Sequence, residues 1–199
     1  MEMRWKNLIN EFMSINSHTN LSAIRDVEGI WIKHIQDSLE INKVLTLKPG
    51  LTLCDIGTGG GFPLLPIAIS NPDIQCIGID STRKKIDAVN EMITKLKITN
   101  AKGIRTRAED FKEKGIIDII TEFDYVTARA VSYIDKLLPQ VHHLVKKWGR
   151  LILYKQYTPE EAQDIIHFGK RYRFVVQKKH TYTLFEGDIQ RIIYVLKKI

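Results

Sequence analysis

The sequence contains few cysteines and lacks the residue spacing of a metal site. Only two cysteines, Cys54 and Cys76, occur among 199 residues, and each lies in an apolar run typical of a strand. A disulfide framework needs more cysteines than this, so we interpret both as small, reduced core residues. The Cys and His residues also lack the spacing of a zinc site, and we predict no bound metal.

Long uncharged hydrophobic segments are missing as well. The longest stretch without a charged residue, 56–72, contains four glycines and three prolines, which makes it a poor membrane span. Four charged residues lie within the first twelve, and no apolar signal-peptide core follows them. Hydrophobic residues make up 44% of the chain, enough for one globular domain with a buried core. We therefore expect a cytoplasmic protein without membrane contact, and we expect it to be a monomer.

The charged residues are unevenly distributed along the chain. The net charge is +7, and residues 146–199 carry 12 Lys and Arg against 5 Asp and Glu, whereas residues 1–145 carry 18 of each. A polyanionic partner such as nucleic acid would explain this basic C-terminal region. A basic surface without any partner would explain it equally well, so charge alone leaves both interpretations open.

The first 50 residues have the pattern of helices. Apolar residues recur at helical spacing between residues 8 and 13 and again between residues 31 and 39, with a polar segment, 15–25, that we predict to be a loop. The dipeptide at 49–50, Pro-Gly, indicates a turn. We therefore predict an N-terminal helical segment, 1–48, packed on a core domain, 49–199.

Beyond residue 50 the sequence alternates between apolar strand-like runs and amphipathic segments, which is typical of a parallel sheet covered on both faces. Strands are predicted at 51–56, 74–79, around Ile104, at 123–127 and at 151–154, and helices at 62–70, 82–96 and from Ser132 to 145, with Gly149 closing the last. Ser132 and Asp135 have the spacing of a capping box. A variable segment is expected from Asp110 onwards.

The last two strand-like runs, 172–177 and 189–196, are separated only by 178–188. This connection is too short for a crossover helix, so we predict an antiparallel hairpin at the edge of the sheet. A parallel sheet that ends in an antiparallel pair distinguishes methyltransferase folds from dehydrogenase folds. The predicted fold class is therefore α/β, with a mostly parallel sheet, a C-terminal antiparallel hairpin and N-terminal helices.

A glycine-rich loop follows the first predicted strand. Its spaced glycines are Gly57, Gly59 and Gly61, and Phe62 stands where a dinucleotide-binding loop has its last glycine. Glycines let the backbone approach a ligand closely. S-adenosylmethionine has no phosphate; it needs close backbone packing and a nearby carboxylate, which Asp55 would supply.

A second acidic residue, Asp80, ends the next predicted strand. A carboxylate at this place accepts hydrogen bonds from both ribose hydroxyls of an adenosine. Because both nucleotide-binding folds use this device, Asp80 indicates adenosine without selecting the cofactor. The glycine spacing, Phe62 and the terminal hairpin together favour S-adenosylmethionine and a Rossmann-like methyltransferase fold. A tight turn without a ligand is the alternative interpretation of the glycines.

Several separate segments match one known pattern. They are NLS at 20–22, HIQDS at 34–38, DIGTGGGFP at 55–63, DSTRKK at 80–85, RAE at 107–109 and TARAV at 127–131. Through them the chain resembles the RsmG (GidB) family of bacterial 16S rRNA guanine-N7 methyltransferases, from about residue 8 to the C-terminus. Ahead of the first helix this sequence is shorter than the usual family pattern, so contacts made by that part are not carried over.

The resemblance implies S-adenosylmethionine as the cofactor, S-adenosylhomocysteine as the product, and one guanine of 16S rRNA in the 30S subunit, conventionally guanine 527, as the substrate. It also implies cofactor contacts beyond the loop itself. Together with the loop, the predicted cofactor-binding residues are Asp55, Gly57, Gly59, Gly61, Phe62, Asp80, Ser81, Thr82, Ala108, Glu109 and Arg129.

Methylation of guanine N7 needs positioning rather than a general base, because N7 presents a lone pair and carries no proton. The predicted catalytic residues are therefore substrate-side residues, namely His34, Asp37, Arg129 and Lys155. His34 and Asp37 share a helical face, and the other two follow strands at the ligand-binding edge of the sheet. The alternatives are a polar pair that packs helices, a surface salt bridge at Arg129 and a solvated lysine at position 155.

Two other functions are compatible with the sequence. A methyltransferase for another RNA or for a small molecule would have the same glycine loop, although a small substrate does not require the localised positive charge. A non-catalytic RNA-binding module could keep the fold, although the intact set of Asp55, Gly57 and Asp80 argues against it.

Overall fold

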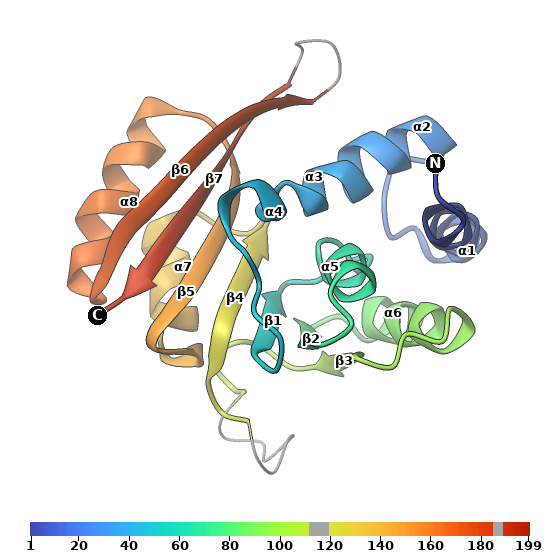
Figure 1. Ribbon diagram of the computed structural model, residues 1–199, viewed down its shortest axis with the longest axis horizontal. Coiled ribbons are helices and arrows are strands. Elements are labelled where there is room, and N and C mark those ends of the chain that lie inside the picture. Colours follow the sequence, from blue (N-terminus) through green and yellow to red (C-terminus); the bar gives the residue numbers. More distant parts are fainter. Residues whose placement is uncertain (112–119, 185–188) are drawn as a thin grey trace.

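A seven-stranded sheet with the order β3-β2-β1-β4-β5-β7-β6 forms the centre of the computed structural model (Figure 1). The structure describes residues 1–111, 120–184 and 189–199. The strands are β1 (Thr52–Ile56), β2 (Gln75–Asp80), β3 (Ala101–Arg105), β4 (Phe123–Arg129), β5 (Val145–Gln156), β6 (Phe174–Leu184) and β7 (Ile189–Lys198). The five neighbouring strands β3, β2, β1, β4 and β5 are parallel to one another. Strand β7 runs antiparallel to both β5 and β6. This topology confirms the predicted fold class and its C-terminal hairpin.

Helices cover both faces of the sheet, because neighbouring residues of a buried strand point to opposite sides. The covering helices are α5 (Leu64–Ser70), α6 (Arg83–Lys95), α7 (Ile134–Val141) and α8 (Pro159–Arg171). Leu53 of β1 packs into the apolar cluster of α5 and α6, and Cys54 packs into the cluster of α7 and α8. Both cysteines are buried and free, which confirms that they are core residues. Within the described ranges, no helix has the length and apolar character needed to cross a membrane.

The N-terminal helices lie beside α5 and α6 (Figure 1). They are α1 (Met3–Thr19), α2 (Val27–Ile30), α3 (Asp37–Leu39) and α4 (Ile41–Val44), with a π-helical segment, Trp31–Gln36, between α2 and α3. Their buried apolar residues belong to the same cluster as those of α5 and α6. π-helical turns are rare and often occur at functional sites, and this one contains His34.

The first helix is longer than predicted. α1 continues to Thr19, so the prediction of a loop over 15–25 is wrong in its first part. The polar composition suggested a loop, but Asn16 is buried and its side chain bonds to the backbone of Ser22 and Ile24. A polar residue fits a buried helical position when its donors and acceptor are satisfied in this way. The helix ends at Asn20, which has the left-handed φ of a C-terminal cap.

The helix predicted from Ser132 is shorter at both ends. α7 begins at Ile134 without a side-chain cap, so the predicted capping box is wrong. At the other end, β5 already starts at Val145 and passes through Gly149, so this glycine does not close a helix. A Cβ at Gly149 would lie about 3 Å from the carbonyl oxygens of Lys146 and Asp124, so glycine is required where the register between β4 and β5 shifts.

The C-terminal third contains more regular structure than the sequence pattern indicated. The prediction omitted α8, because its buried residues are few, although Thr158 caps it and Pro159 is its first residue. β6 continues to Leu184, so much of the predicted connection 178–188 is strand. The remainder of that connection, 185–188, lies outside the described residues, as does 112–119 of the segment predicted to be variable from Asp110.

Candidate active site

The glycine loop connects β1 to α5 at the carboxyl edge of the parallel strands. Gly57, Gly59 and Gly61 all have positive φ angles, of 65°, 57° and 90°, which side chains other than glycine adopt at a cost. The Thr58 amide donates to the carbonyl of Ile79 in β2, over 2.9 Å. The loop is thus held against the end of β2 with its backbone turned toward the edge where ligands bind in α/β sheets.

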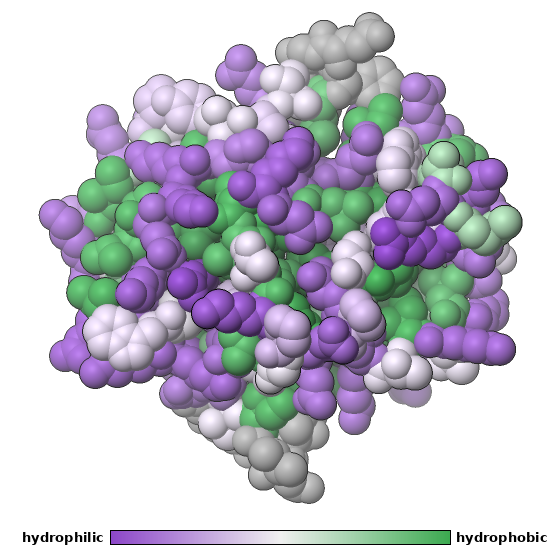
Figure 2. All heavy atoms as spheres, viewed as in Figure 1, coloured by the Kyte–Doolittle hydropathy of each residue, from purple (hydrophilic) through white to green (hydrophobic). Residues whose placement is uncertain are grey.

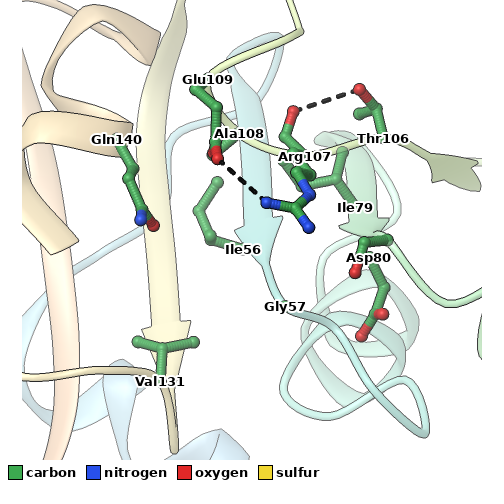
Figure 3. Close-up of a pocket in the computed structure, with 11 residues that line it drawn as sticks. Ile56, Gly57, Ile79, Asp80, Thr106, Arg107, Ala108, Glu109, Val131 and Gln140 are labelled. Atoms are coloured by element: carbon green, nitrogen blue, oxygen red, sulfur yellow. Dashed lines mark hydrogen bonds and ion pairs between the residues drawn. The ribbon is translucent and has the colours of Figure 1, made fainter. Parts of the chain in front are cut away.

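A cavity of about 270 Å³ lies at the ends of β1, β2, β3 and β4 (Figure 3). Its lining residues are Ile56, Gly57, Ile79, Asp80, Ser81, Thr106, Arg107, Ala108, Glu109, Val131 and Gln140. Figure 3 shows Val131 and Gln140 facing Asp80 across this space. Here the chain presents a carboxylate, backbone groups and small side chains in a partly apolar cavity, which suits an adenosine. We call it the adenosine cavity.

Asp80 is fixed in place by the two loops that flank it. Its Oδ1 accepts from the Thr82 amide over 2.8 Å, and its Oδ2 accepts from the Gly59 amide over 3.2 Å. The Lys85 ammonium lies 3.7 Å from the same Oδ2. A carboxylate held in this way is oriented before a ligand arrives, so it is suited to bind ribose hydroxyls.

A second cavity, of about 210 Å³, lies on the other side of Gly57. Its lining includes Gly59, Phe62, His34 and Arg129, together with Ser22 and Lys85. The rings of His34 and Phe62 are stacked, with centroids 4.7 Å apart and planes inclined by 16°. We call this the ring cavity, because a pair of stacked rings forms one of its walls.

A third cavity, of about 230 Å³, adjoins the ring cavity and shares His34, Arg129 and Ala130 with it. Its other lining residues are Lys33, Asp37, Leu184 and Arg191. The π-helical segment, the end of β4 and the β6–β7 pair therefore meet at this point. No local pattern in the sequence could have indicated that Leu184 and Arg191 lie beside His34 and Arg129.

Asp37 lies at the centre of a buried polar cluster. Its side chain is only 2% exposed, and its carboxylate lies 2.9 Å from Arg129 Nη1 and 3.3 Å from Arg191 Nη2. The Tyr182 hydroxyl donates to Asp37 Oδ1 over 2.6 Å. Arg129 also donates to the carbonyl of Lys33 in the π-helical segment. Asp37 thus joins the N-terminal helices to the end of β4 and to the hairpin, and it holds Arg129 at the cavity wall.

His34 is uncharged at neutral pH. Burial and the nearby Arg129 guanidinium lower the pKa of His34 from 6.5 to about 4. Its Nε2 lies 2.9 Å from the Ser22 hydroxyl, and its ring edge meets Phe12. A histidine with this pKa is a weak base, so its ring acts as a planar wall of the cavity rather than as a proton acceptor.

Asp55 lies beneath the glycine loop rather than on a cavity wall. It is fully buried, and its Oδ1 accepts from the Thr127 hydroxyl over 2.8 Å. Burial raises the pKa of Asp55 from 3.8 to about 6, and hydrogen bonding from Thr127, Thr58 and the Leu64 backbone opposes this shift in part. The ionised carboxylate beneath the loop would stabilise a cationic group above it.

Lys155 does not face a cavity. Its ammonium is 8% exposed, lies 2.6 Å from Glu161 Oε1 in α8 and donates to the carbonyl of Ser132. The prediction that Lys155 is a substrate-side residue of the site rested on its place after a predicted strand at the ligand-binding edge. The tertiary structure instead turns its side chain toward a buried carboxylate, and none of the three cavities contains it.

We predict that Lys155→Ala lowers the free energy of unfolding by about 3 kcal/mol, because Glu161 would remain buried without its counter-charge. The cofactor affinity of the folded protein should not change. Denaturant unfolding and calorimetric titration with cofactor measure the two effects. The matched control is the double variant K155M/E161L, which removes both charges and should recover much of the lost stability. A lower cofactor affinity of the folded Lys155→Ala protein would show that Lys155 does contribute to the site.

The structure brings together most of the predicted site residues but not all of them. The adenosine cavity contains Gly57, Asp80, Ser81, Ala108 and Glu109, and the ring cavity contains Gly57, Gly59, Phe62, His34 and Arg129. Asp37 lines the third cavity. Thr82 stands at the N-terminal cap position of α6 without a side-chain capping hydrogen bond, and Gly61 packs on Leu65; neither lines one of the three cavities. The sequence reasoning gave no role to Ser22, Tyr182, Arg191 or Gln140, although the NLS segment at 20–22 was a signal for the first.

Fold and site together define a class of protein. An S-adenosylmethionine-dependent methyltransferase from Aquifex aeolicus has the same fold, with a TM-score of 0.62 at 18% identity over 86% of this chain and 93% of that one. The two cavities that meet at Gly57 suit S-adenosylmethionine, as do the oriented carboxylate of Asp80 and the buried carboxylate of Asp55 beneath the loop. The protein thus has the fold of the Rossmann-like, S-adenosylmethionine-dependent methyltransferases.

The particular family follows from sequence comparison. The GidB model, described as rRNA small subunit methyltransferase G, matches residues 1–194. Ribosomal RNA small subunit methyltransferase G from Lachnoclostridium phytofermentans is 35% identical over 92% of this chain and 76% of its own length. The protein of the same name from Limosilactobacillus reuteri is 36% identical over 92% of this chain and 77% of its own length. The chain belongs to this family, which confirms the resemblance found in its motifs.

Proposed function

We propose that this protein transfers the methyl group of S-adenosylmethionine to N7 of one guanine in 16S rRNA, conventionally guanine 527. Family membership supports small-subunit rRNA as the substrate class. The observation that carries the proposal is the junction at Gly57, where the adenosine cavity meets the ring cavity. The guanine can enter the ring cavity while the cofactor occupies the adenosine cavity on the other side of Gly57.

When bound, S-adenosylmethionine supplies an electrophilic methyl group on a positively charged sulfur. The residues of this chain bind and orient. Asp80 accepts hydrogen bonds from the ribose, and Gly57 lets the backbone approach the cofactor without a Cβ. The stacked rings of His34 and Phe62 offer a flat apolar surface to a planar base. Correct alignment alone can contribute on the order of 7–11 kcal/mol to such a step.

The electrostatics of the ring cavity suit a product that carries positive charge. Guanine methylated at N7 is a cation, so an unpaired guanidinium beside it would oppose the reaction. Asp37 offsets part of the charge of Arg129, since the same carboxylate also pairs with Arg191, and His34 stays neutral because its pKa is about 4. The wall then combines aromatic faces, which attract cations, with an arginine that has a carboxylate partner. No proton has to leave N7, so a weakly basic His34 does not limit the chemistry.

The pKa of Asp55 leads to a pH prediction. Its raised pKa means that Asp55 is largely protonated at pH 5 and ionised at pH 7, and only the ionised form attracts the cationic amino end of the cofactor. We expect the affinity for S-adenosylmethionine to rise about tenfold between pH 5 and pH 7. The contribution of Asp55 to stability runs the other way and is lost as the pH rises from about 4 through 6, because the unfolded carboxyl ionises first.

Calorimetric titration over this pH range measures the affinity, and Asp55→Asn should give a flat profile. If the affinity of the wild-type protein is equally independent of pH, the charge of Asp55 does not contribute to cofactor binding. Asp124→Asn is a matched control, since it changes a carboxyl whose pKa is lowered and which lies away from the loop, bound to Thr52 and Lys146.

The decisive experiment for the activity uses labelled cofactor and 30S subunits isolated without this methylation. We expect one labelled N7-methylguanine in the decoding-region loop of 16S rRNA. Label at another base or another ring atom would overturn the assignment of the guanine. If the cofactor binds but no label reaches the 30S subunits, or if label reaches only small molecules, the proposal that rRNA is the substrate is wrong.

We also propose a division of labour between the two parts of the chain, with 49–199 binding the cofactor and 1–48 contributing the π-helical wall of the ring cavity. We also expect the protein to act as a monomer. An enzyme that acts on the small subunit would work in the cytoplasm, where ribosomes are assembled. Light scattering of the active protein tests whether it is a monomer. A protein that is active only as a dimer would contradict this expectation.

A further inference from the structure

Several basic C-terminal residues lie at the end of the sheet opposite the active site, whereas Arg191 lines the third cavity. β5 starts at Val145 and reaches the cofactor edge at Tyr154, which pairs with Arg129 of β4. Trp148 therefore lies six residues back along this strand, on the order of 20 Å from Arg129 at the usual rise of a strand. The antiparallel β7 brings Lys197 to the same end, opposite Arg150. α8 ends there as well, with Lys170 and Arg171 in its last turn.

Trp148 is the exposed centre of this opposite edge. It is 55% exposed, whereas the largest aromatic side chains of the sheet are buried. The Lys147 ammonium lies 5.1 Å and the Lys197 ammonium 5.0 Å from the centroid of its ring. Val175, which pairs with Lys197 on the neighbouring strand, is 41% exposed and extends the apolar part of the surface. We call these four residues the Trp148 surface.

The backbone holds Trp148 outward at some cost. Its φ is 67°, a left-handed conformation that a bulky residue adopts rarely. The following residue, Gly149, fits closely against the backbone of β4, which fixes the strand at this point. Strain of this kind persists only where the surrounding structure enforces it, and it often accompanies function. The backbone conformation at Trp148 and Gly149 therefore enforces the exposure of the tryptophan side chain.

The charge of this edge favours a polyanion. Lys147, Lys197, Lys170 and Arg171 form no ion pair with a carboxylate of the described residues, whereas Lys146 beside them is paired with Asp124. Figure 2 shows hydrophilic and hydrophobic side chains intermixed on the side of the molecule where the C-terminus lies. Unpaired cations bind phosphates, and an exposed indole stacks on unpaired bases. An anionic membrane would also attract cations, but a single exposed tryptophan at the edge of a sheet offers little area for insertion into lipid.

We propose that the Trp148 surface is a second RNA-binding site, which holds a phosphate backbone and one unpaired base of the ribosomal RNA outside the target loop. This inference rests on the proposed rRNA substrate. Because the Trp148 surface lies far from the ring cavity, an RNA whose target loop fills the ring cavity can also bind the Trp148 surface only if it spans the distance between them. It would contribute to the affinity for a whole folded RNA and would add nothing for a short loop that fills the active site alone.

The test is the equilibrium binding of intact 16S rRNA and of a short hairpin with the target loop, without methyl transfer. In K147E/K197E we expect the affinity for 16S rRNA to fall at least tenfold and the log–log salt slope to shrink by about 1.4, which corresponds to two phosphates on a single strand. W148A should lose about tenfold, and W148F should retain most of the binding. Hairpin binding and cofactor affinity should not change.

A matched control carries the same change of charge elsewhere. Lys102 in β3 and Lys136 in α7 are exposed and lie away from this edge, so K102E/K136E should bind 16S rRNA like the wild type. Equal losses in both double variants, a wild-type affinity in K147E/K197E, or a W148A loss seen with vesicles of anionic lipid but not with RNA would each overturn the proposal. If no variant methylates RNA but binding still depends on Trp148, the proposed activity fails and the RNA-binding surface stands.

Discussion

Asp37→Ala is expected to lower kcat/KM for methyl transfer about 100-fold and to lower the free energy of unfolding by about 3–5 kcal/mol. The carboxylate is 2% exposed and lies between two guanidinium groups that are themselves 11% and 18% exposed. Removing one partner of a buried ion pair leaves the other charge without compensation. Here two arginines would lose their partner, and the Tyr182 hydroxyl would lose its acceptor.

The loss of activity follows from the position of Arg129. Its guanidinium lines both the ring cavity and the third cavity, and Asp37 is the carboxylate that holds it there. A shift of about 1 Å in a group that positions the substrate can cost a factor of 100 in rate. An uncompensated Arg129 would also oppose the positive charge that develops on guanine. We therefore expect kcat to fall more than the affinity for S-adenosylmethionine.

Steady-state kinetics on 30S subunits and denaturant unfolding measure these two effects. Asp37→Asn keeps the shape but not the charge, so it should lie between wild type and Asp37→Ala. The matched control is Glu40→Ala, which removes a nearby carboxylate paired with Lys43 and His180 and lining none of the three cavities. An Asp37→Ala protein that is less stable but turns over at the wild-type rate would reduce this residue to a packing role.

Gly57→Val is expected to weaken S-adenosylmethionine binding by at least 100-fold. Gly57 forms part of the wall of both the adenosine cavity and the ring cavity, so a side chain there would occupy the place where they meet. A Cβ would lie 3.1 Å from Val131 Cγ1, closer than normal contact. The φ of 65° adds a backbone cost of roughly 1–2 kcal/mol for a residue with a side chain.

Gly50→Val separates the backbone cost from the effect on the cofactor. Gly50 also has a left-handed φ, of 77°, but nothing lies within 4 Å of its virtual Cβ. Both variants should lose the backbone contribution to stability, and Gly57→Val should lose more because of its close contact with Val131. Only Gly57→Val should lose cofactor affinity in calorimetric titration. Similar affinities in the two variants would show that the glycine loop does not approach the cofactor at this residue.

The family and the cofactor were readable from local patterns. The loop glycines, Asp80 at the end of the next strand and the HIQDS and TARAV segments are each contiguous in sequence, and the structure brings Gly57, Asp80, His34 and Arg129 to adjoining cavities. The alternation of apolar strands with amphipathic helices also predicted the parallel sheet, because each pattern repeats with the period of its element. The errors in the predicted elements concerned boundaries, such as the end of α1 and the capping box at Ser132, and the omission of α8, whose buried side is small.

The roles of individual charged residues were not readable in the same way. Lys155 and Arg129 both follow strands at the same edge of the sheet, yet one pairs with Glu161 of α8 and the other lines two cavities. The partners of Asp37 are 92 and 154 residues away along the chain. A sequence pattern records spacing along one element, whereas an ion pair depends on how separate elements pack.

By itself, the sequence determined the fold class, the cofactor and the family, because glycine spacing, strand ends and apolar periodicity are local properties. Only the tertiary structure decided which residues share a cavity, that Asp37 holds Arg129, and that Lys147 and Lys197 lie around Trp148 at the edge opposite the glycine loop. The physical reason is the antiparallel return of β7, which carries the cations of the C-terminus back along β5, away from the edge where the cofactor binds.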